Sequence, residues 1–364
     1  MKKLLIEAEK INVFSDCSDK HFCLVTNKEL KDLIQIKENN HFISNTIYTI
    51  DDEYNFEYIL HKTLPDNACV LVISPYVFFE SPPQKTLGNR RVIAMACNST
   101  PTSIDDIAHF WECLVQTDPQ EQQLKTDVFF ELGQESQHLR FIDYKNNTEA
   151  VFMHMDESYL WSEQTGILND GEQQLAPSGE ISVLPINIQE FDKTLRLDIN
   201  GTIALHGTPI LHNGTPSFTR EDQKRIHSNL SKISKSAIIA TIKNGEITDI
   251  KATSPISQKA VDTLNCMFEI DSRYRILWEI GFGINKNIKL RAGNHAMNET
   301  YGAENGCIHF GLGLTPYTQY HLDIICPNMN VLTDNNTTLI GTPKKIKKMN
   351  ILRNTQGNCL CTEF

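Results

Sequence analysis

The sequence predicts an α/β domain followed by an α+β domain built mainly of antiparallel strands. The chain has 364 residues, and at ~100–200 residues per domain this length favours two domains. Short apolar runs suited to buried strands, followed by a helical pattern, indicate α/β structure in the first part. After about residue 150, alternating segments and Asn-Gly turns are typical of antiparallel sheet. We place the boundary at residue 165, giving domains 1–165 and 166–364.

The first domain contains the local signals of an open α/β fold. Buried strands are predicted at 69–73 (CVLVI) and 91–96 (RVIAMA), separated by a Pro- and Gly-containing loop. Apolar residues recur at helical spacing over 103–115, which begins with the capping residue Ser103, so a helix is expected there. The chain has no glycine-rich phosphate-binding motif, and a nucleotide cofactor is therefore not expected.

The second domain has the alternation of half-buried strands. The run 195–199 alternates apolar and polar residues and precedes an Asn-Gly pair at 200–201, which predicts a hairpin. A second Asn-Gly pair, at 244–245, predicts another hairpin. Helical spacing over 258–268 predicts one helix among these strands.

Composition excludes several classes of protein. The 34 Lys and Arg against 45 Asp and Glu give a net charge of −11, which argues against a nucleic-acid-binding face. No apolar run approaches the ~18 residues of a membrane span, and acidic residues interrupt the N-terminal apolar stretch. The ten cysteines are scattered, several within apolar runs, as is typical of reduced, buried thiols. We therefore expect a cytoplasmic protein without nucleic-acid or membrane partners.

Acids and histidines concentrate in three segments of the second half. Glu180 follows a Pro-Ser-Gly turn and opens a strand-like run. Glu279 stands in an apolar run before two glycines; if it is buried, its carboxylate must be paired or coordinated. The glycines indicate close approach of backbone or ligand. Taken singly, a surface position after the turn is the better prediction for Glu180, and Glu279 is also compatible with a strand edge that faces solvent.

The third segment holds two histidines and an in-phase acid. His321 and Asp323 are two residues apart, so in a strand they point to the same face. His309 lies twelve residues earlier, and a lone histidine in such a run is usually a core residue. Together with the two carboxylates, these residues favour a metal site. We interpret His206 and His212 as structural, because no carboxylate stands at a ligand spacing from either.

These segments resemble the thermophilic-type metalloaminopeptidases (the aminopeptidase T family) and the related 2,5-dihydroxypyridine dioxygenases. Residues 176–185 (APSGEISVLP) resemble the family's Pro-x-Gly-Glu segment, and 278–285 (WEIGFGIN) its Glu-Leu-Gly-Ile-Gly-x-Asn stretch. Residues 304–313 (ENGCIHFGLG) are similar to Glu-Asn-x-x-x-His-x-Ala-x-Gly, and 321–323 to His-x-Asp. The resemblance covers roughly residues 170–342.

The resemblance implies a two-metal site at the domain junction. Glu180 and His309 would bind one ion, His321 and Asp323 the other, and Glu279 would bridge them. The ligand types suit zinc, cobalt or manganese. In the dioxygenase branch the site would instead hold one Fe(II), with His321, Asp323 and either His309 or Glu279 as ligands.

The resemblance also implies catalytic groups and partners. Where the peptidases have a catalytic Tyr this chain has Pro316, so Tyr317 and Tyr320 are candidate replacements, and His295 is a candidate substrate-binding group. We expect a metal-dependent hydrolase that acts on a peptide or amide bond of a peptide or small molecule, and a homodimer. The alternatives are a mononuclear iron oxygenase and a non-catalytic peptide-binding relative in a biosynthetic pathway.

Overall fold

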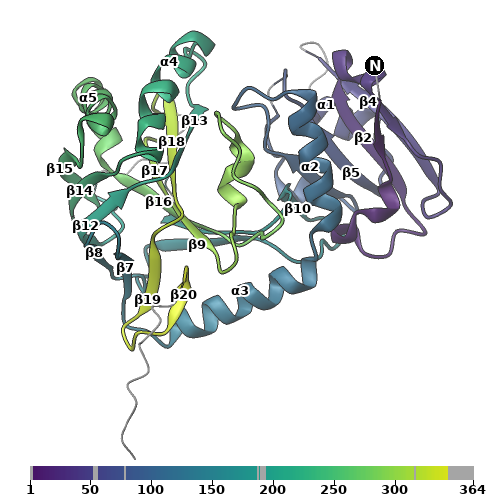
Figure 1. The fold of residues 1–364 in the computed structure, drawn as a ribbon. Helices are drawn as coiled ribbons and strands as arrows, with labels where there is room; N and C mark the ends of the chain where they lie inside the picture. Colours follow the sequence, from purple (N-terminus) through teal and green to yellow (C-terminus); the bar gives the residue numbers. More distant parts are fainter. Residues whose placement is uncertain are drawn as a thin grey trace, which may run out of the picture.

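The computed structural model describes residues 3–51, 56–77, 79–186, 188, 194–314 and 317–342, so Pro316 lies outside the described residues. The described chain is a mixed α/β structure with one five-stranded parallel sheet and two larger antiparallel sheets (Figure 1). The fold class is therefore confirmed at this level. Among the described residues, no helix combines the length and the apolar character needed to cross a membrane.

The N-terminal part is built on the parallel sheet. Its strands, in spatial order, are β10 (Gln173–Ala176), β6 (Arg91–Met95), β5 (Ala68–Ile73), β2 (His21–Asn27) and β4 (Ser44–Ile50). The helices α1 (Phe56–Lys62) and α2 (Ile104–Gln116) contribute to the apolar clusters on its two faces. A short parallel pair, β1 (Leu4–Ile6) and β3 (Ile34–Ile36), lies beside it. The predicted strands at 69–73 and 91–96 are confirmed, as is the helix: Ser103 caps α2 by accepting a hydrogen bond from the Asp106 N–H.

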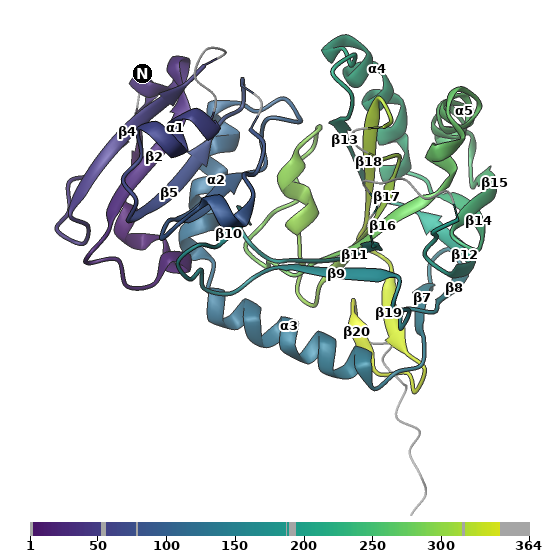
Figure 2. The same ribbon diagram turned by 180° about the vertical axis from the view of Figure 1, so that it is seen from behind.

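The C-terminal part consists of two antiparallel sheets around one apolar core. The six-stranded sheet contains, in spatial order, β13 (Thr208–Asn213), β18 (Tyr320–Cys326), β17 (Cys307–Leu312), β16 (Leu277–Gly283), β11 (Glu180–Pro185) and β9 (Tyr159–Gln164). The seven-stranded sheet contains β15 (Glu246–Ala252), β14 (Ile238–Lys243), β12 (Ile199–Leu205), β8 (Thr148–Phe152), β7 (Leu139–Asp143), β19 (Asn330–Thr333) and β20 (Thr338–Ile340). Helices α4 (Arg220–Leu230) and α5 (Pro255–Ile270) add apolar side chains to the core, and α3 (Pro119–Gln134) runs from the N-terminal part beneath the sheets (Figure 2).

The two Asn-Gly pairs have different outcomes. The pair at 244–245 forms the predicted turn between β14 and β15, with both residues at positive φ. The hairpin predicted at 200–201 is wrong, because both residues lie inside β12 and pair with β8. Gly201 is required there for another reason: a Cβ would meet the Glu149 carbonyl oxygen at 2.4 Å.

The two parts are interleaved along the chain. Strands β7, β8 and β9 precede residue 165 but hydrogen-bond to strands that follow it. Strand β10 follows residue 165 but pairs with β6. The predicted boundary therefore does not coincide with the division between the sheets, and the chain passes from one part to the other more than once.

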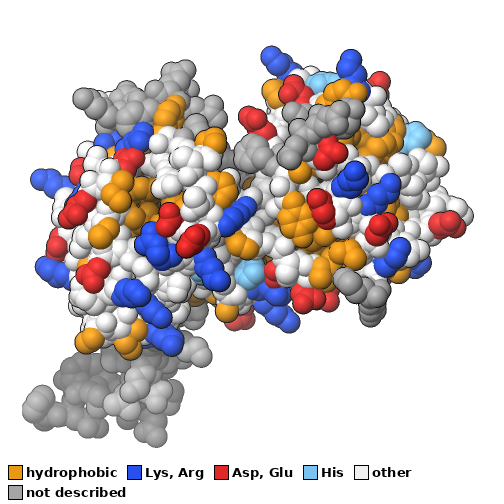
Figure 3. Space-filling model, turned by 90° about the horizontal axis from the view of Figure 1, so that it is seen from above, with side chains coloured by type: hydrophobic (Ala, Val, Ile, Leu, Met, Phe, Trp, Pro, Cys, Tyr) orange, Lys and Arg blue, Asp and Glu red, His pale blue; other side chains and the backbone are white. Residues whose placement is uncertain are grey.

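The surface charges and the cysteines bear on two expectations from the composition, namely that no basic face is present and that the thiols are buried. On the face seen in Figure 3, basic and acidic side chains are interspersed, so this face carries no uninterrupted basic surface. The cysteines of the described residues are free thiols and mostly buried. Cys266 is exposed and is an exception to the expectation that the cysteines are buried.

Candidate metal centre

One face of the six-stranded sheet carries the predicted acids and histidines. In β18, Leu322 and Ile324 pack in the core between the sheets. Since side chains alternate along a strand, His321 and Asp323 point to the opposite face, as predicted. Gly311 of β17 pairs with Asp323 of β18 on one side and with Glu279 of β16 on the other. Residues from several strands thereby meet on one surface.

Glycines make room for this cluster. A Cβ on Gly281 would lie 2.0 Å from Nε2 of His309, the residue opposite it in β17. A Cβ on Gly311 would lie 2.8 Å from the Glu279 Cβ and 3.2 Å from Asp323 Oδ1. The close approach predicted for the glycines of β16 is thus made by an imidazole ring at Gly281.

The five predicted ligand residues form two groups that share Glu279. One group is Glu180, Glu279 and His309, and the other is Glu279, His321 and Asp323; within each group the ligand atoms lie within 4.8 Å of one another. His309 Nε2 is 3.4 Å from Glu180 Oε1. His321 Nε2 is 3.2 Å from Asp323 Oδ1 and 3.6 Å from Glu279 Oε2. The sheet therefore brings together all five residues.

The spacings and chemistry of these groups fit a divalent metal. Two donors bonded at ~2.0–2.1 Å to a tetrahedral ion lie ~3.3 Å apart, close to the separations above. Asp323 Oδ1 is enclosed and accepts no hydrogen bond of regular geometry, although a buried carboxylate oxygen normally has a partner. His321 Nδ1 lies 3.0 Å from the Gly313 carbonyl oxygen, the kind of contact that orients a metal-binding imidazole.

A third group was not foreseen from the sequence. His212 and Glu299 lie with Asp323 in a further set of potential ligands. His212 Nε2 is 3.1 Å from Asp323 Oδ2 and also contacts Glu299 Oε1. Because one imidazole nitrogen of His212 faces both carboxylates, we interpret His212 and Glu299 as an ion pair beside the metal ligands. The interpretation of His212 as a structural residue missed this position.

The N-terminal part supports this pair. Ser99, in the loop after β6, places its Oγ 2.7 Å from His212 Nδ1. Glu299 belongs to the short helix η8 (Ala296–Thr300), which lies between the two parts in Figure 1. The loop before η8 is fixed to α2 by an ion pair of 2.8 Å between Arg291 and Asp106. A cavity of about 290 Å³ beside the cluster is accordingly lined by residues of both parts.

Burial and mutual charge shift the pKa values of the cluster. Burial raises the pKa of Glu180 to about 7. Burial lowers the pKa values of His309 and His212, but neighbouring carboxylates outweigh this effect and raise both to about 9. The pKa of His321 is well above its ordinary value because of Asp323, and His321 in turn holds the pKa of the buried Asp323 low. A cation would have to displace protons from these imidazoles.

The three predicted catalytic residues do not line the cavity. Tyr320 faces the core, on the side of the sheet opposite the cluster, and its hydroxyl donates to a backbone carbonyl before α4. Tyr317 packs in a small apolar cluster with Trp278. His295 lies beside α2, with Nδ1 3.6 Å from Asp106 Oδ1.

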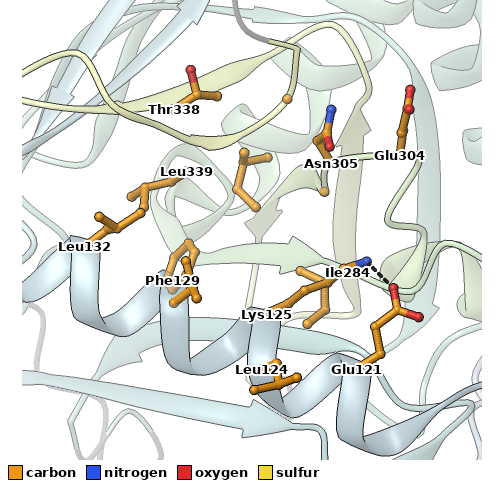
Figure 4. A pocket seen from close by; sticks show the side chains of 14 residues that line it. Glu121, Leu124, Lys125, Phe129, Leu132, Ile284, Glu304, Asn305, Thr338 and Leu339 are labelled. Carbon is orange, nitrogen blue, oxygen red and sulfur yellow. Dashed lines mark ion pairs between the residues drawn. The ribbon is translucent and has the colours of Figure 1, made fainter.

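A larger cavity, of about 460 Å³, lies between α3 and the chain before β17 and around β20 (Figure 4). Phe129 and Leu132 of α3 point into it opposite Ile284 and Leu339, and Leu124 also contributes to its lining. Its charged lining residues are Glu121, Lys125 and Glu304, and no histidine lines it. This lining offers few of the ligands that a transition metal prefers.

The comparisons with known proteins reveal a likeness of fold. No protein-family model matches the chain, and no curated protein matches it. A solved structure of 2,5-dihydroxypyridine dioxygenase from Pseudomonas putida aligns over 93% of this chain and 95% of its own, with 13% identity and a TM-score of 0.53. A structure of AmpT from Thermus thermophilus aligns over 88% and 91%, with 14% identity and a TM-score of 0.42. The chain therefore shares its overall fold with the first of these structures.

Proposed function

We propose that the protein is a metal-dependent hydrolase that cleaves a peptide or amide bond. The observation that carries the proposal is the pair of ligand groups joined by Glu279. Each group contains one imidazole and two carboxylates, at the spacing of ligands around an ion. A shared carboxylate is the means by which two ions are held side by side, and a pair of bound divalent ions supplies a water activated at neutral pH and a polarised carbonyl.

The chain's own residues fit this role in charge and position. The proposed ligand set contains three carboxylates, Glu180, Glu279 and Asp323, which when ionised offset most of the charge of two divalent cations. Glu279 lines the cavity together with both imidazoles of the proposed ligand set. The loop bearing Ser99 approaches the cluster from the N-terminal part and lines the cavity beside it.

The proposal is tested by metal analysis and by an activity screen. The purified chain is stripped of metal and dialysed against Zn²⁺, Co²⁺, Mn²⁺ or anaerobic Fe²⁺, and the bound metal per chain is measured. We expect two equivalents of one of the first three ions, together with cleavage of aminoacyl anilides. Glu279→Ala removes the shared ligand and should abolish metal binding and cleavage. Glu304 is an exposed glutamate outside the cluster, so Glu304→Ala should leave metal binding and cleavage unchanged.

A mononuclear iron dioxygenase is the second candidate. The likeness in fold to a dioxygenase supports it only at the level of architecture. The specific observation is that all three members of one ligand group, Glu279, His321 and Asp323, line the cavity. An Fe(II) ion held there would have open positions that face the cavity, as a dioxygenase site requires. One equivalent of iron with substrate-dependent oxygen consumption would favour this candidate over the hydrolase. No bound metal under any condition would leave the peptide-binding alternative.

A further inference from the structure

A second hollow, of about 300 Å³, adjoins the cavity beside the cluster. Val92 and Ala94 lie two residues apart in β6, so they share one face of the parallel sheet, and Ala96 follows directly after the end of the strand. The first two line the hollow and Ala96 lines the cavity of the cluster. Leu175 of β10, paired with Ala94, lines both spaces. The floor therefore continues from the cluster into the hollow.

The opposite wall of the hollow is fixed in place by side chains. It is formed by the loop that contains Phe79 and Ser81. Gln173 Nε2 donates to the Pro82 carbonyl at 2.6 Å, which joins this loop to β10. Asn98 Nδ2 donates to the Phe79 carbonyl at 3.1 Å, and Asn98 also lines the cavity of the cluster. The hollow is thus a preformed extension of that cavity.

The lining of the hollow differs in chemistry from that of the cluster. Its residues are apolar or carry uncharged amide and hydroxyl groups: Phe79, Ser81, Val92, Ala94, Gln164, Gln173, Gln174 and Leu175. A charged group placed there would lose water without gaining an opposite charge, which is costly. An apolar group would gain by leaving water. The volume is at the lower end of the ~300–1,000 Å³ of ligand pockets, which suits one side chain better than an extended peptide.

We infer that this hollow is a side-chain subsite that binds an uncharged, mainly apolar residue of the substrate, next to the bond held at the cluster. The inference rests on the proposed function, since the hollow acquires this role only if a bond is held at the cluster. It narrows the substrate to peptides or amides with an aliphatic or aromatic residue at that position.

Amino-acid hydroxamates test the inference without turnover. The full chain is loaded with Zn²⁺, and the binding of acetohydroxamate, leucine hydroxamate and lysine hydroxamate is measured by titration calorimetry. Acetohydroxamate has no side chain and reports on the cluster alone. We expect leucine hydroxamate to bind at least about tenfold more tightly than lysine hydroxamate, since apolar pockets discriminate by such factors.

Two substitutions in the exposed loop complete the test. Ser81→Phe should fill the hollow and remove the preference for leucine hydroxamate while leaving acetohydroxamate binding unchanged. Gln84→Phe adds the same ring to an exposed residue of the same loop outside the lining and should change nothing. If acetohydroxamate binds but leucine and lysine hydroxamates bind equally, or if the preference survives Ser81→Phe, the subsite is refuted alone. If no hydroxamate binds, the proposed function and the subsite are both overturned.

Discussion

Replacing Gly281 by Ala tests directly how the cluster is built. The new Cβ would stand 2.0 Å from His309 Nε2 and 2.1 Å from Cε1, whereas contacts of a Cβ below 3.0 Å essentially never occur. The imidazole must therefore move by about 1 Å, since the backbone of a central strand is held on both sides. His309 is almost completely buried, so the ring has little free space into which it can turn.

Gly281→Ala should reduce both the stability of the protein and its affinity for metal. Forcing extra volume into a packed site costs about 1–3 kcal/mol. Moving the ring away from Glu180, now 3.4 Å from it, should weaken metal binding at that group by about 10–100-fold, the effect of disturbing a ligand's support. The group of Glu279, His321 and Asp323 keeps its ligands, so we expect one of two metal equivalents to be lost.

The assays are urea unfolding and metal analysis after dialysis against Zn²⁺. Gly133→Ala in α3 is the matched control, because a Cβ there meets no atom within 4 Å. It should be neutral or stabilise the protein by up to about 1 kcal/mol, the ordinary effect of removing a glycine from a helix. If Gly281→Ala matches the wild type within about 0.5 kcal/mol, the limit for substitutions without structural consequence, and binds the same amount of metal, the placement of the ring is refuted.

Three further predictions concern the pH dependence of stability, the contact between Ser99 and His212, and the buried amide of Asn285. The metal-free protein should lose stability to urea from pH ~6.5 to about 9, because the folded-state pKa values of His212 and His309 are raised to about 9 above an unfolded value of ~6.5; a rise in stability over this range would contradict the burial of these imidazoles among carboxylates. Ser99→Ala removes the contact that orients His212, which is itself the partner of the ligand Asp323. Metal binding should weaken by less than the ~10-fold minimum for losing a ligand's own partner, and calorimetry that finds an unchanged affinity would show that this contact does not support the site. Asn285→Ala removes a buried amide bonded to both parts, and urea unfolding should give a loss of about 1–3 kcal/mol; no loss would contradict this bridging role.

The sequence was sufficient to identify the candidate ligands that lie on strands. His321 and Asp323 could be assigned to one face because the period of a strand is two, and their face was then fixed by the apolar residues between them. Glu279 stood out because a carboxylate in an apolar run needs a partner. These signals are local, and the strands that bear them form where they were expected.

Long-range pairing explains the failures. The Asn-Gly signal at 200–201 is overridden because β8 and β14 flank β12 and extend it through the pair. His212 reaches the cluster only because β13 pairs with β18 and sets it opposite His321. Glu299 lies on a short helix in a loop, where no periodicity marks its direction. The sequence contains these residues but gives no pattern from which their partners could be read.

The position of the cluster also explains why the two parts are needed together. The face of the six-stranded sheet that bears the ligands is opposite the apolar core, so without a cover these carboxylates and imidazoles would be solvated and only weakly coupled. The loop with Ser99 and the loop fixed by Asp106 provide that cover. Enclosure makes the excess of four carboxylates over three imidazoles in the cluster costly and a bound cation correspondingly favourable. A site of this kind therefore trades stability of the metal-free chain for affinity, and loosening the cover should weaken metal binding even when every ligand is kept.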